Sequence, residues 1–204
     1  MHDLFSTLTP SAQLTREEFH ARFDVAWAHL SSRFFKFECQ QSYDEGPDSA
    51  FHAFVRHDLN VFVEKAVRTG RAVGEYLKTP KERGATFLRI HAVSTPLTEY
   101  LTYELHAYVV NEYFGEQVFL IDVDEAERIV GGPLKDFQLF DADVLFVQDV
   151  LNGVNVGVTE SRNPVDIARA VDVIERLRRA SRSFRTNSGL DPQLVARLEG
   201  TCRS

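Results

Sequence analysis

The stretch RIHAVSTPLTEYLTYELHAYVVNEYFGEQVFLIDVDEAERIVGGPLKDFQLFD, residues Arg89 to Asp141, decides the fold expected for this chain. It begins with an apolar strand and continues through a helix with clear ends, a second apolar strand, a short acidic helix and a third strand. This order has the form of a βαβ unit that runs into a hairpin. Polar side chains stand inside it where the periodicity favours apolar ones, so it is also the first place to look for a site.

The first strand of this stretch places two polar side chains together. From Ala85 to Val93 the alternation puts Arg89 and His91 on one face, as a period of two requires. The later run from Val118 to Ile121 is continuously apolar, which is typical of a strand covered on both faces. We therefore expect a buried sheet that carries polar groups on its first strand.

The helix between these strands has recognisable ends. Thr95 is the expected N-cap, Pro96 has the backbone angle favoured at the first helical position, and Gly115 ends the helix. Tyr100 and Glu104 are four residues apart, so their side chains lie on one face of this helix.

Two acidic residues after the second strand have two interpretations. Asp122 and Asp124 could hold a divalent ion at the strand end, but Asp124 with Glu127 also fits an N-cap and its reciprocal acid, which we favour. The turn from Gly131 to Pro133 is not a phosphate loop, because no strand leads into it and no Gly-Lys-Ser/Thr follows. No metal and no cofactor are expected.

The chain beyond this stretch is predicted to continue as an antiparallel meander. Asp141 to Asp143 and Asn152-Gly153 mark two hairpin turns, and Asn163-Pro164 begins the last long helix. An arginine cluster near its end could attract nucleic acid, although cations also stabilise a helix C-terminus without a ligand, which we favour. The cluster consists of Arg176, Arg178, Arg179, Arg182 and Arg185.

The part before Arg89 is predicted to begin with a flexible arm, residues 1–13, and a helix that starts at a capping box on Thr15. A strand-like aromatic run follows from Phe34 to Tyr43. Ser49 then caps a long amphipathic helix that ends at Gly70. The segment from Arg71 to Gly84 contains glycine, proline and a charged run, so it is expected to be an exposed loop.

Length and composition favour a single α/β domain over residues 14–185, with a mixed β-sheet flanked by helices and a short helix and tail over residues 186–204. The net charge of -7 makes direct binding of nucleic acid unfavourable, because such binding depends on basic residues.

Two cysteines without paired spacing, Cys39 and Cys202, fit a reducing compartment. Without a signal peptide or a membrane-spanning run, the chain is expected to be cytoplasmic.

Several of these residues together resemble a known family. The arginine strand, Pro96, Tyr100, Glu104-Leu105, Gly115-Glu116, Asp136-Phe137 and Leu139-Phe140-Asp141 are similar to an uncharacterised family of actinobacterial domains, often encoded beside helix-turn-helix regulators. The resemblance covers roughly Phe34 to Phe184. It implies a cytoplasmic accessory of a bacterial regulatory or stress module. A helix-turn-helix regulator is the expected partner, and a homodimer is a further option.

Two functional hypotheses follow. The first is a non-enzymatic component that binds a partner or ligand through Arg89, His91, Tyr100, Glu104, Asp136 and Asp141. The same residues could instead form an ion-pair network of Arg89 with Glu104 or Asp136 that only supports the fold. The second hypothesis is a small hydrolase or nuclease that uses His91, Glu104 and Asp141, since the strand pattern ending at Asp141 is similar to phospholipase-D-like regions. The His-x-Lys motif of active members is absent.

Overall fold

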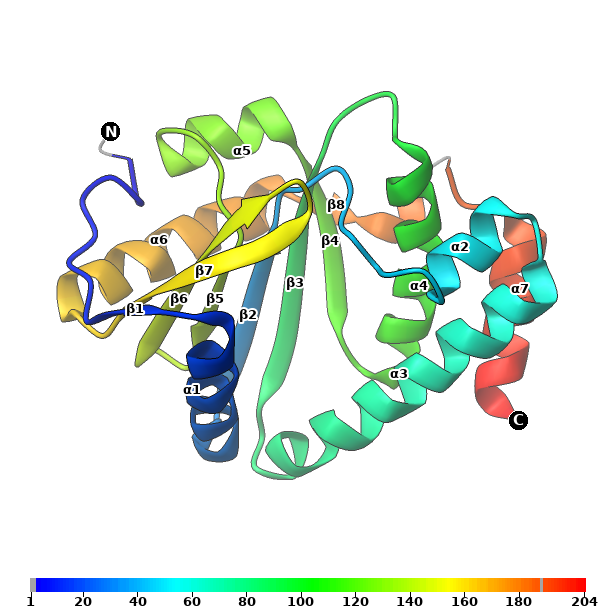
Figure 1. The fold of residues 1–204 in the computed structure, drawn as a ribbon, viewed down its shortest axis with the longest axis horizontal. Helices are drawn as coiled ribbons and strands as arrows, with labels where there is room; N and C mark the ends of the chain where they lie inside the picture. Colours follow the sequence, from blue (N-terminus) through cyan, green and yellow to red (C-terminus); the bar gives the residue numbers. More distant parts are fainter. Residues whose placement is uncertain (1–2, 188) are drawn as a thin grey trace.

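The centre of the structure is a mixed sheet of eight strands in the order β1-β7-β6-β5-β2-β3-β4-β8 (Figure 1). The computed structural model describes residues 3–187 and 189–204. Strands β2, β3 and β4 are parallel to one another, and the remaining neighbours pair antiparallel. The strands are β1 (Ala12–Leu14), β2 (Arg33–Glu38), β3 (Thr86–Val93), β4 (Gln117–Asp122), β5 (Phe137–Phe140), β6 (Val144–Leu151), β7 (Val154–Ser161) and β8 (Arg182–Ser183). The chain is thus the single mixed α/β domain that the sequence predicts.

The predicted βαβ unit is present, because β3 and β4 are adjacent and parallel and are joined by α4 (Glu99–Phe114). Gly115 ends the helix with a φ of 108°, a backbone angle that glycine adopts without strain. The predicted N-cap was wrong by three residues: Thr98 caps the helix and its hydroxyl accepts from the amide of Leu101. Pro96 therefore precedes the helix, in a cis peptide bond with Thr95.

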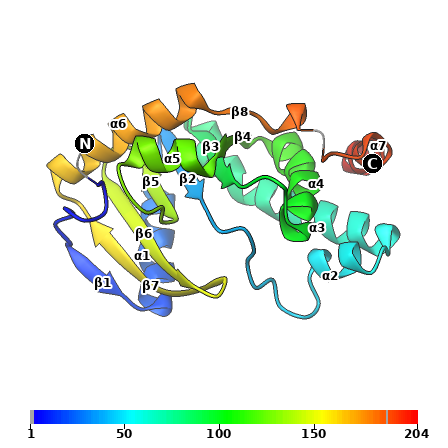
Figure 2. The ribbon, with the colours of Figure 1, turned by 90° about the horizontal axis from the view of Figure 1, so that it is seen from above.

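Helices cover both faces of the sheet (Figure 2). One face packs against α5 (Val123–Val130) and α6 (Pro164–Ala180), where Phe35, Phe37 and Ile90 are fully buried. On the other face, α1 (Arg16–His29) and the C-terminal part of α3 (Leu59–Glu82) cover one half of the sheet, and α4 with the N-terminal part of α3 lies over the other half. Two separate apolar clusters therefore form on this face, and the site lies where they meet.

The expected exposed loop from Arg71 to Gly84 is wrong, because α3 runs through it to Glu82. The helix predicted from Ser49 to Gly70 is instead two helices, α2 (Ala50–Val55) and α3, which are separated by a bend at His57. Gly70 does not end a helix; a Cβ at this position would lie 2.3 Å from the Val110 side chain of α4. The glycine permits close helix packing, a role that local sequence does not distinguish from a helix end.

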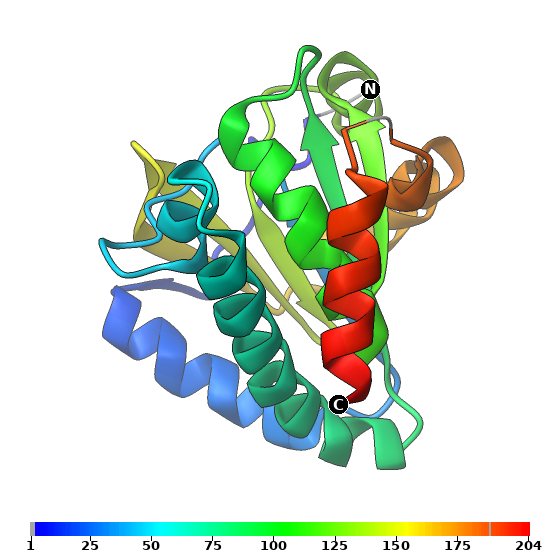
Figure 3. The same cartoon turned by 90° about the vertical axis from the view of Figure 1, so that its right-hand side faces the viewer.

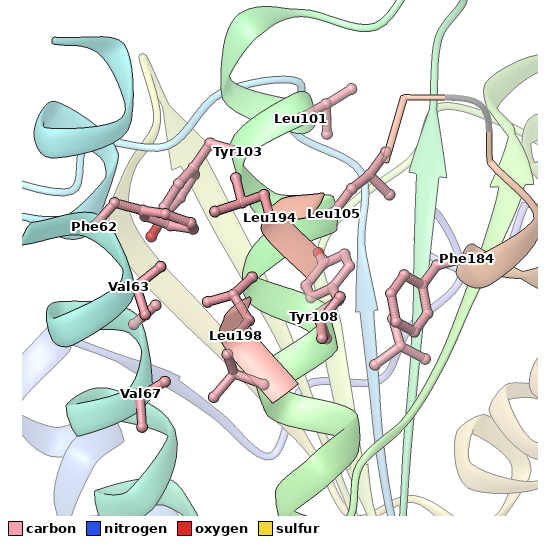
Figure 4. Close-up of a cluster of buried hydrophobic side chains, with 14 of the residues drawn as sticks. Phe62, Val63, Val67, Leu101, Tyr103, Leu105, Tyr108, Phe184, Leu194 and Leu198 are labelled. Carbon is pink, nitrogen blue, oxygen red and sulfur yellow. The ribbon is translucent and has the colours of Figure 1, made fainter. Parts of the chain in front are cut away.

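Segments near both ends of the described chain pack onto this domain. Leu4 is buried and its amide donates to the carbonyl oxygen of Val130, while β1 adds an edge strand beside β7. At the other end, α7 (Pro192–Arg203) is longer than the predicted short helix and lies beside α3 and α4 (Figure 3). It buries Leu194 and Leu198 in the cluster around Phe62 and Tyr108 (Figure 4).

Candidate functional site

Five polar residues line up across three neighbouring strands in the middle of the sheet. Lys36 of β2 stands opposite Arg89 of β3 on one side and Gln138 of β5 on the other, and Glu38 stands opposite His91. These five residues, called here the polar rows, share one face because alternate residues of a strand point the same way. The apolar cluster under α1 contains Phe34, Phe87 and Phe140, and the cluster under α4 contains Val93, Val118 and Leu120. The polar rows lie between these two apolar regions.

Arg89 is paired with two buried carboxylates. Its Nη1 donates to Oε2 of Glu38 at 2.6 Å, and its Nε and Nη2 donate to Oε2 and Oε1 of Glu116 at 3.0 and 3.1 Å. Lys36 Nζ lies 2.6 Å from the other oxygen of Glu38. Burial alone would raise the pKa of Glu38, but Arg89 and Lys36 outweigh it and hold that pKa well below its ordinary value. The four side chains form a neutral, mutually bonded set.

The sequence predicted an ion pair of Arg89 with Glu104 or Asp136, whereas the structure pairs it with Glu38 and Glu116. The sequence contains a local signal for both partners that the prediction missed, Glu38 and Glu116. Glu38 follows Lys36 at the alternate position of an aromatic strand, and Glu116 stands directly after the glycine that ends the helix. Neither position identifies a partner, because the pairing depends on strands that are distant in sequence.

His91 is fully buried and belongs to a second set of contacts with α4. Its Nδ1 lies 2.7 Å from the Tyr108 hydroxyl and 3.1 Å from Oε2 of Glu104, and its Nε2 lies 2.9 Å from the carbonyl oxygen of Gln40. Tyr108 donates to the same Glu104 oxygen. Burial alone would lower the pKa of His91, but the contact with Glu104 outweighs it and raises that pKa. This geometry favours an imidazolium that donates from both ring nitrogens.

Asp136 and Tyr100 reach the same region from outside the strands of the polar rows. Asp136, just before β5, accepts from the Tyr43 hydroxyl at 2.6 Å and from the amide of Cys39 at 2.8 Å. Tyr100, in the first turn of α4, donates to Glu45 at 2.6 Å. Burial raises the pKa of Asp136, and the nearby Glu38 adds to this effect.

A cavity of about 350 Å³ lies over these groups, a volume within the range of small-ligand sites. One wall of the cavity is the β6–β7 hairpin. This hairpin is joined to the loop after β2 by a hydrogen bond from the Asp44 amide to the Gly153 carbonyl oxygen. A larger cavity of about 660 Å³ lies near α5 and α6, with a mostly aliphatic lining. The smaller cavity is lined by Lys36, Glu38, Tyr43, Asp44, Glu45, Arg89, Tyr100, Glu104, Asp136, Gln148, Val150, Gly153 and Asn155.

The structure brings four of the six residues expected at the site to this cavity, namely Arg89, Tyr100, Glu104 and Asp136. His91 lies behind it, in contact with Glu104. Asp141 is elsewhere: it follows β5, whereas Asp136 precedes it, and its carboxylate accepts from the amides of Ser31, Ser32 and Arg33. The sequence did not identify Tyr43, Glu45 or Glu38, which lie in or just after β2.

Other features singled out in the sequence have local roles. Asp122, and not Asp124 as predicted, caps α5. Within residues 3–187 and 189–204 there is no group of three or more histidine, cysteine, aspartate or glutamate side chains placed to hold a metal. In the arginine cluster, Arg178 lies over the Phe119 ring at 3.5 Å, and Arg185 pairs with Glu112 and Glu199. No helix in this described part combines the length and the apolar character that a bilayer span requires.

Comparisons with known proteins give a family match. A family model described as a domain of unknown function, DUF6879, matches residues 21–186. A search of curated proteins gave no match. Among solved structures, the chain is similar to TrmBL2, described as an archaeal chromatin protein with a novel mode of DNA binding, with a TM-score of 0.42 at 6% sequence identity. That alignment covers 87% of this chain and 55% of the other, so the chain spans about half the length of the chromatin protein.

Proposed function

The chain belongs to the DUF6879 family of domains of unknown function, and we propose that it is a non-enzymatic binding domain whose site is the cavity over the polar rows. The main support is the state of the cavity floor. Arg89 and Lys36 are held by Glu38 and Glu116, so the floor is a fixed polar surface whose charges already have partners. A preorganised surface of this kind suits recognition, because a ligand can bind without breaking the groups that support it.

The cavity also has walls that suit a small polar ligand. Tyr43 and Tyr100 present rings whose centroids are 5.8 Å apart, and Asp136, Glu45 and Glu104 bring carboxylates to the lining. Ligand sites commonly combine aromatic surface with a few convergent polar groups. We infer that the ligand lies against the two rings and donates hydrogen bonds to these carboxylates.

The alternative of a hydrolase or nuclease has less support. It requires His91 to exchange a proton with a substrate, but this ring is fully buried and both of its nitrogens lie within hydrogen-bonding distance of Tyr108, Glu104 or Gln40. It also requires Asp141, whose carboxylate caps the backbone before β2. A general acid or base must be within reach of the substrate atoms, which favours the binding hypothesis here.

We further propose that binding serves a bacterial regulatory or stress module, in the cytoplasm, with a helix-turn-helix regulator as the partner. The support is the resemblance of the stretch from Arg89 to Asp141 to actinobacterial domains that are encoded beside such regulators. Co-expression with the regulator encoded nearest to this chain, followed by size-exclusion chromatography, tests the partnership. Separate elution of the two chains at micromolar concentration would count against it.

Two tryptophan variants of the β6–β7 hairpin test the cavity as the site. Val150 is half-buried and lines the cavity, whereas the next residue, Leu151, is 62% exposed and is not among its lining residues. A library of small polar molecules is screened against the wild-type chain by protein NMR. We expect some of these molecules to change the NMR chemical shifts of residues around the cavity. Val150→Trp should abolish their binding, and Leu151→Trp should retain it. Equal binding by both variants, or no ligand at the cavity, would overturn the proposal.

A further inference from the structure

The cations in the cavity floor have carboxylate partners, whereas some carboxylates of the cavity wall have no cation beside them in the described part of the chain. This difference indicates the class of ligand. The two cations of the floor already have carboxylate partners: each nitrogen of the Arg89 guanidinium donates to Glu38 or Glu116, and Lys36 Nζ contacts Glu38. A bound anion would have to compete with these buried carboxylates for the same donors. The floor therefore offers little to an anionic ligand.

Two of the remaining carboxylates, Asp136 and Glu45, have neutral donors in place of cations. Asp136 accepts from the Tyr43 hydroxyl and the Cys39 amide, and Glu45 accepts from the Tyr100 hydroxyl. Burial raises the pKa of both carboxyl groups, and neighbouring glutamates raise it further. A positive charge placed between them would relieve this repulsion, because an opposite charge favours the ionised form of a carboxyl group.

The two tyrosines that line the cavity also favour a donor-rich, cationic ligand. The Tyr43 and Tyr100 rings, which contact each other with an interplanar angle of 57°, offer electron-rich faces that attract organic cations. Hydroxyl groups that already donate to carboxylates leave their oxygen lone pairs as acceptors for a ligand.

A bare metal ion does not fit this arrangement. The carboxylates belong to the loop after β2, to α4 and to the segment before β5, and the described residues provide no group of three ligands that could hold a metal. A cation for these separated acceptors needs N–H donors that point in several directions. Ammonium and guanidinium groups have this property, and both are common partners of carboxylates.

We propose that the cavity binds a small organic cation, with one or more ammonium or guanidinium groups held between Asp136 and Glu45 and against the Tyr43 and Tyr100 rings. This inference rests on the proposed binding function and names the chemical class of its ligand. The cation donates to the two carboxylates, and its carbon chain lies along the rings. The volume of about 350 Å³ suits a small molecule of this kind.

Three probes of equal chain length and different charge test the inference. 1,4-Diaminobutane is a dication, 1,4-butanediol is neutral and succinate is a dianion at neutral pH. Each is titrated into the full chain in the same low-salt buffer, and binding is followed by calorimetry and by NMR shift changes at the cavity. We expect the diamine to bind at least about tenfold more tightly than the diol, since a hydrogen bond to a charged group is the stronger type, and succinate not to bind.

Variants separate a site from general attraction to an acidic protein. Glu45→Gln removes one charge while leaving an oxygen for Tyr100, and it should weaken diamine binding by about tenfold or more. Asp124→Asn removes the same charge from an exposed position on α5 and should leave binding unchanged. Equal loss in both variants would overturn the inference.

The library screen described above supplies the remaining outcomes. Neutral or anionic ligands at the cavity, with no preference for cations, overturn the inference and leave the binding function standing. The absence of any ligand at the cavity overturns both.

Discussion

Replacing Arg89 by methionine gives a direct test of how the polar rows are held together. The change leaves Glu116 buried without its cation and Glu38 buried with Lys36 alone, since the two carboxylate side chains are only 9% and 5% exposed. Removing one partner of a buried ion pair typically costs about 3–5 kcal/mol of unfolding free energy. For a chain of this length, that loss corresponds to a fall in Tm of roughly 6–20 °C.

The loss of unfolding free energy in the Arg89→Met variant should depend on pH. The direction of this dependence follows from the pKa of Glu38. In the wild-type chain its pKa is lowered, so its ion pair contributes stability above the ordinary carboxyl pKa, and this contribution is lost as the pH falls through the lowered value. Without Arg89, mainly Lys36 opposes the effect of burial, so the pKa of Glu38 is expected to rise from its wild-type value. The variant should therefore recover part of its deficit relative to wild type as the pH falls from about 7 to about 5.

Urea unfolding followed by circular dichroism at both pH values measures this effect. Arg33→Met is the matched control, because Arg33 forms a 2.7 Å ion pair with Glu175 in which the side chains are 29% and 44% exposed. An exposed pair of this kind should contribute about 1 kcal/mol or less. Adding Glu116→Gln to Arg89→Met should restore stability. A deficit below about 1 kcal/mol, or one that is unaffected by pH and by the second change, would refute the reasoning.

Three further predictions concern other parts of the structure. The raised pKa of His91 means that its contribution to stability is complete below about pH 6.5 and is lost as the pH rises through the folded value; His91→Gln should flatten this part of the pH–stability curve, measured by urea unfolding. Gly70→Ala should destabilise the chain by about 1–3 kcal/mol because of overpacking against α4. Gly200 lies in α7 with open space around it, so Gly200→Ala should stabilise the chain by about 0.5–1 kcal/mol. The Tm of each variant, measured by thermal unfolding, checks both expectations. Burial and the adjacent Asp136 raise the pKa of Cys39, so its alkylation at pH 8 should be at least about tenfold slower in the folded chain than in urea, and equal rates would contradict this burial.

The βαβ unit could be predicted because its signals are local. The alternation around Arg89 and the glycine after α4 each identify one element without knowledge of its neighbours. Strand order follows from such units, since consecutive parallel strands joined by a helix commonly pair. The sequence therefore located the centre of the fold correctly.

The features that could not be predicted depend on contacts between distant segments. Glycines at 70 and 74 resemble a helix end until Val110 and Phe114 of α4 are placed against them. In the same way, Glu38 becomes a partner of Arg89 only when β2 pairs with β3 in the observed register. The candidate site was located through Arg89, Tyr100, Glu104 and Asp136 because these residues interrupt an apolar pattern.

The neutral set formed by Arg89, Lys36, Glu38 and Glu116 has a consequence for how such a domain can diverge or be engineered. These four residues support the sheet, whereas Glu45 belongs to a loop and contacts the cavity from its margin. Changes in that loop can alter what is recognised while the supporting charges stay paired. Selectivity can thus be redesigned at the margin of the cavity without exchanging the residues that keep the strands together.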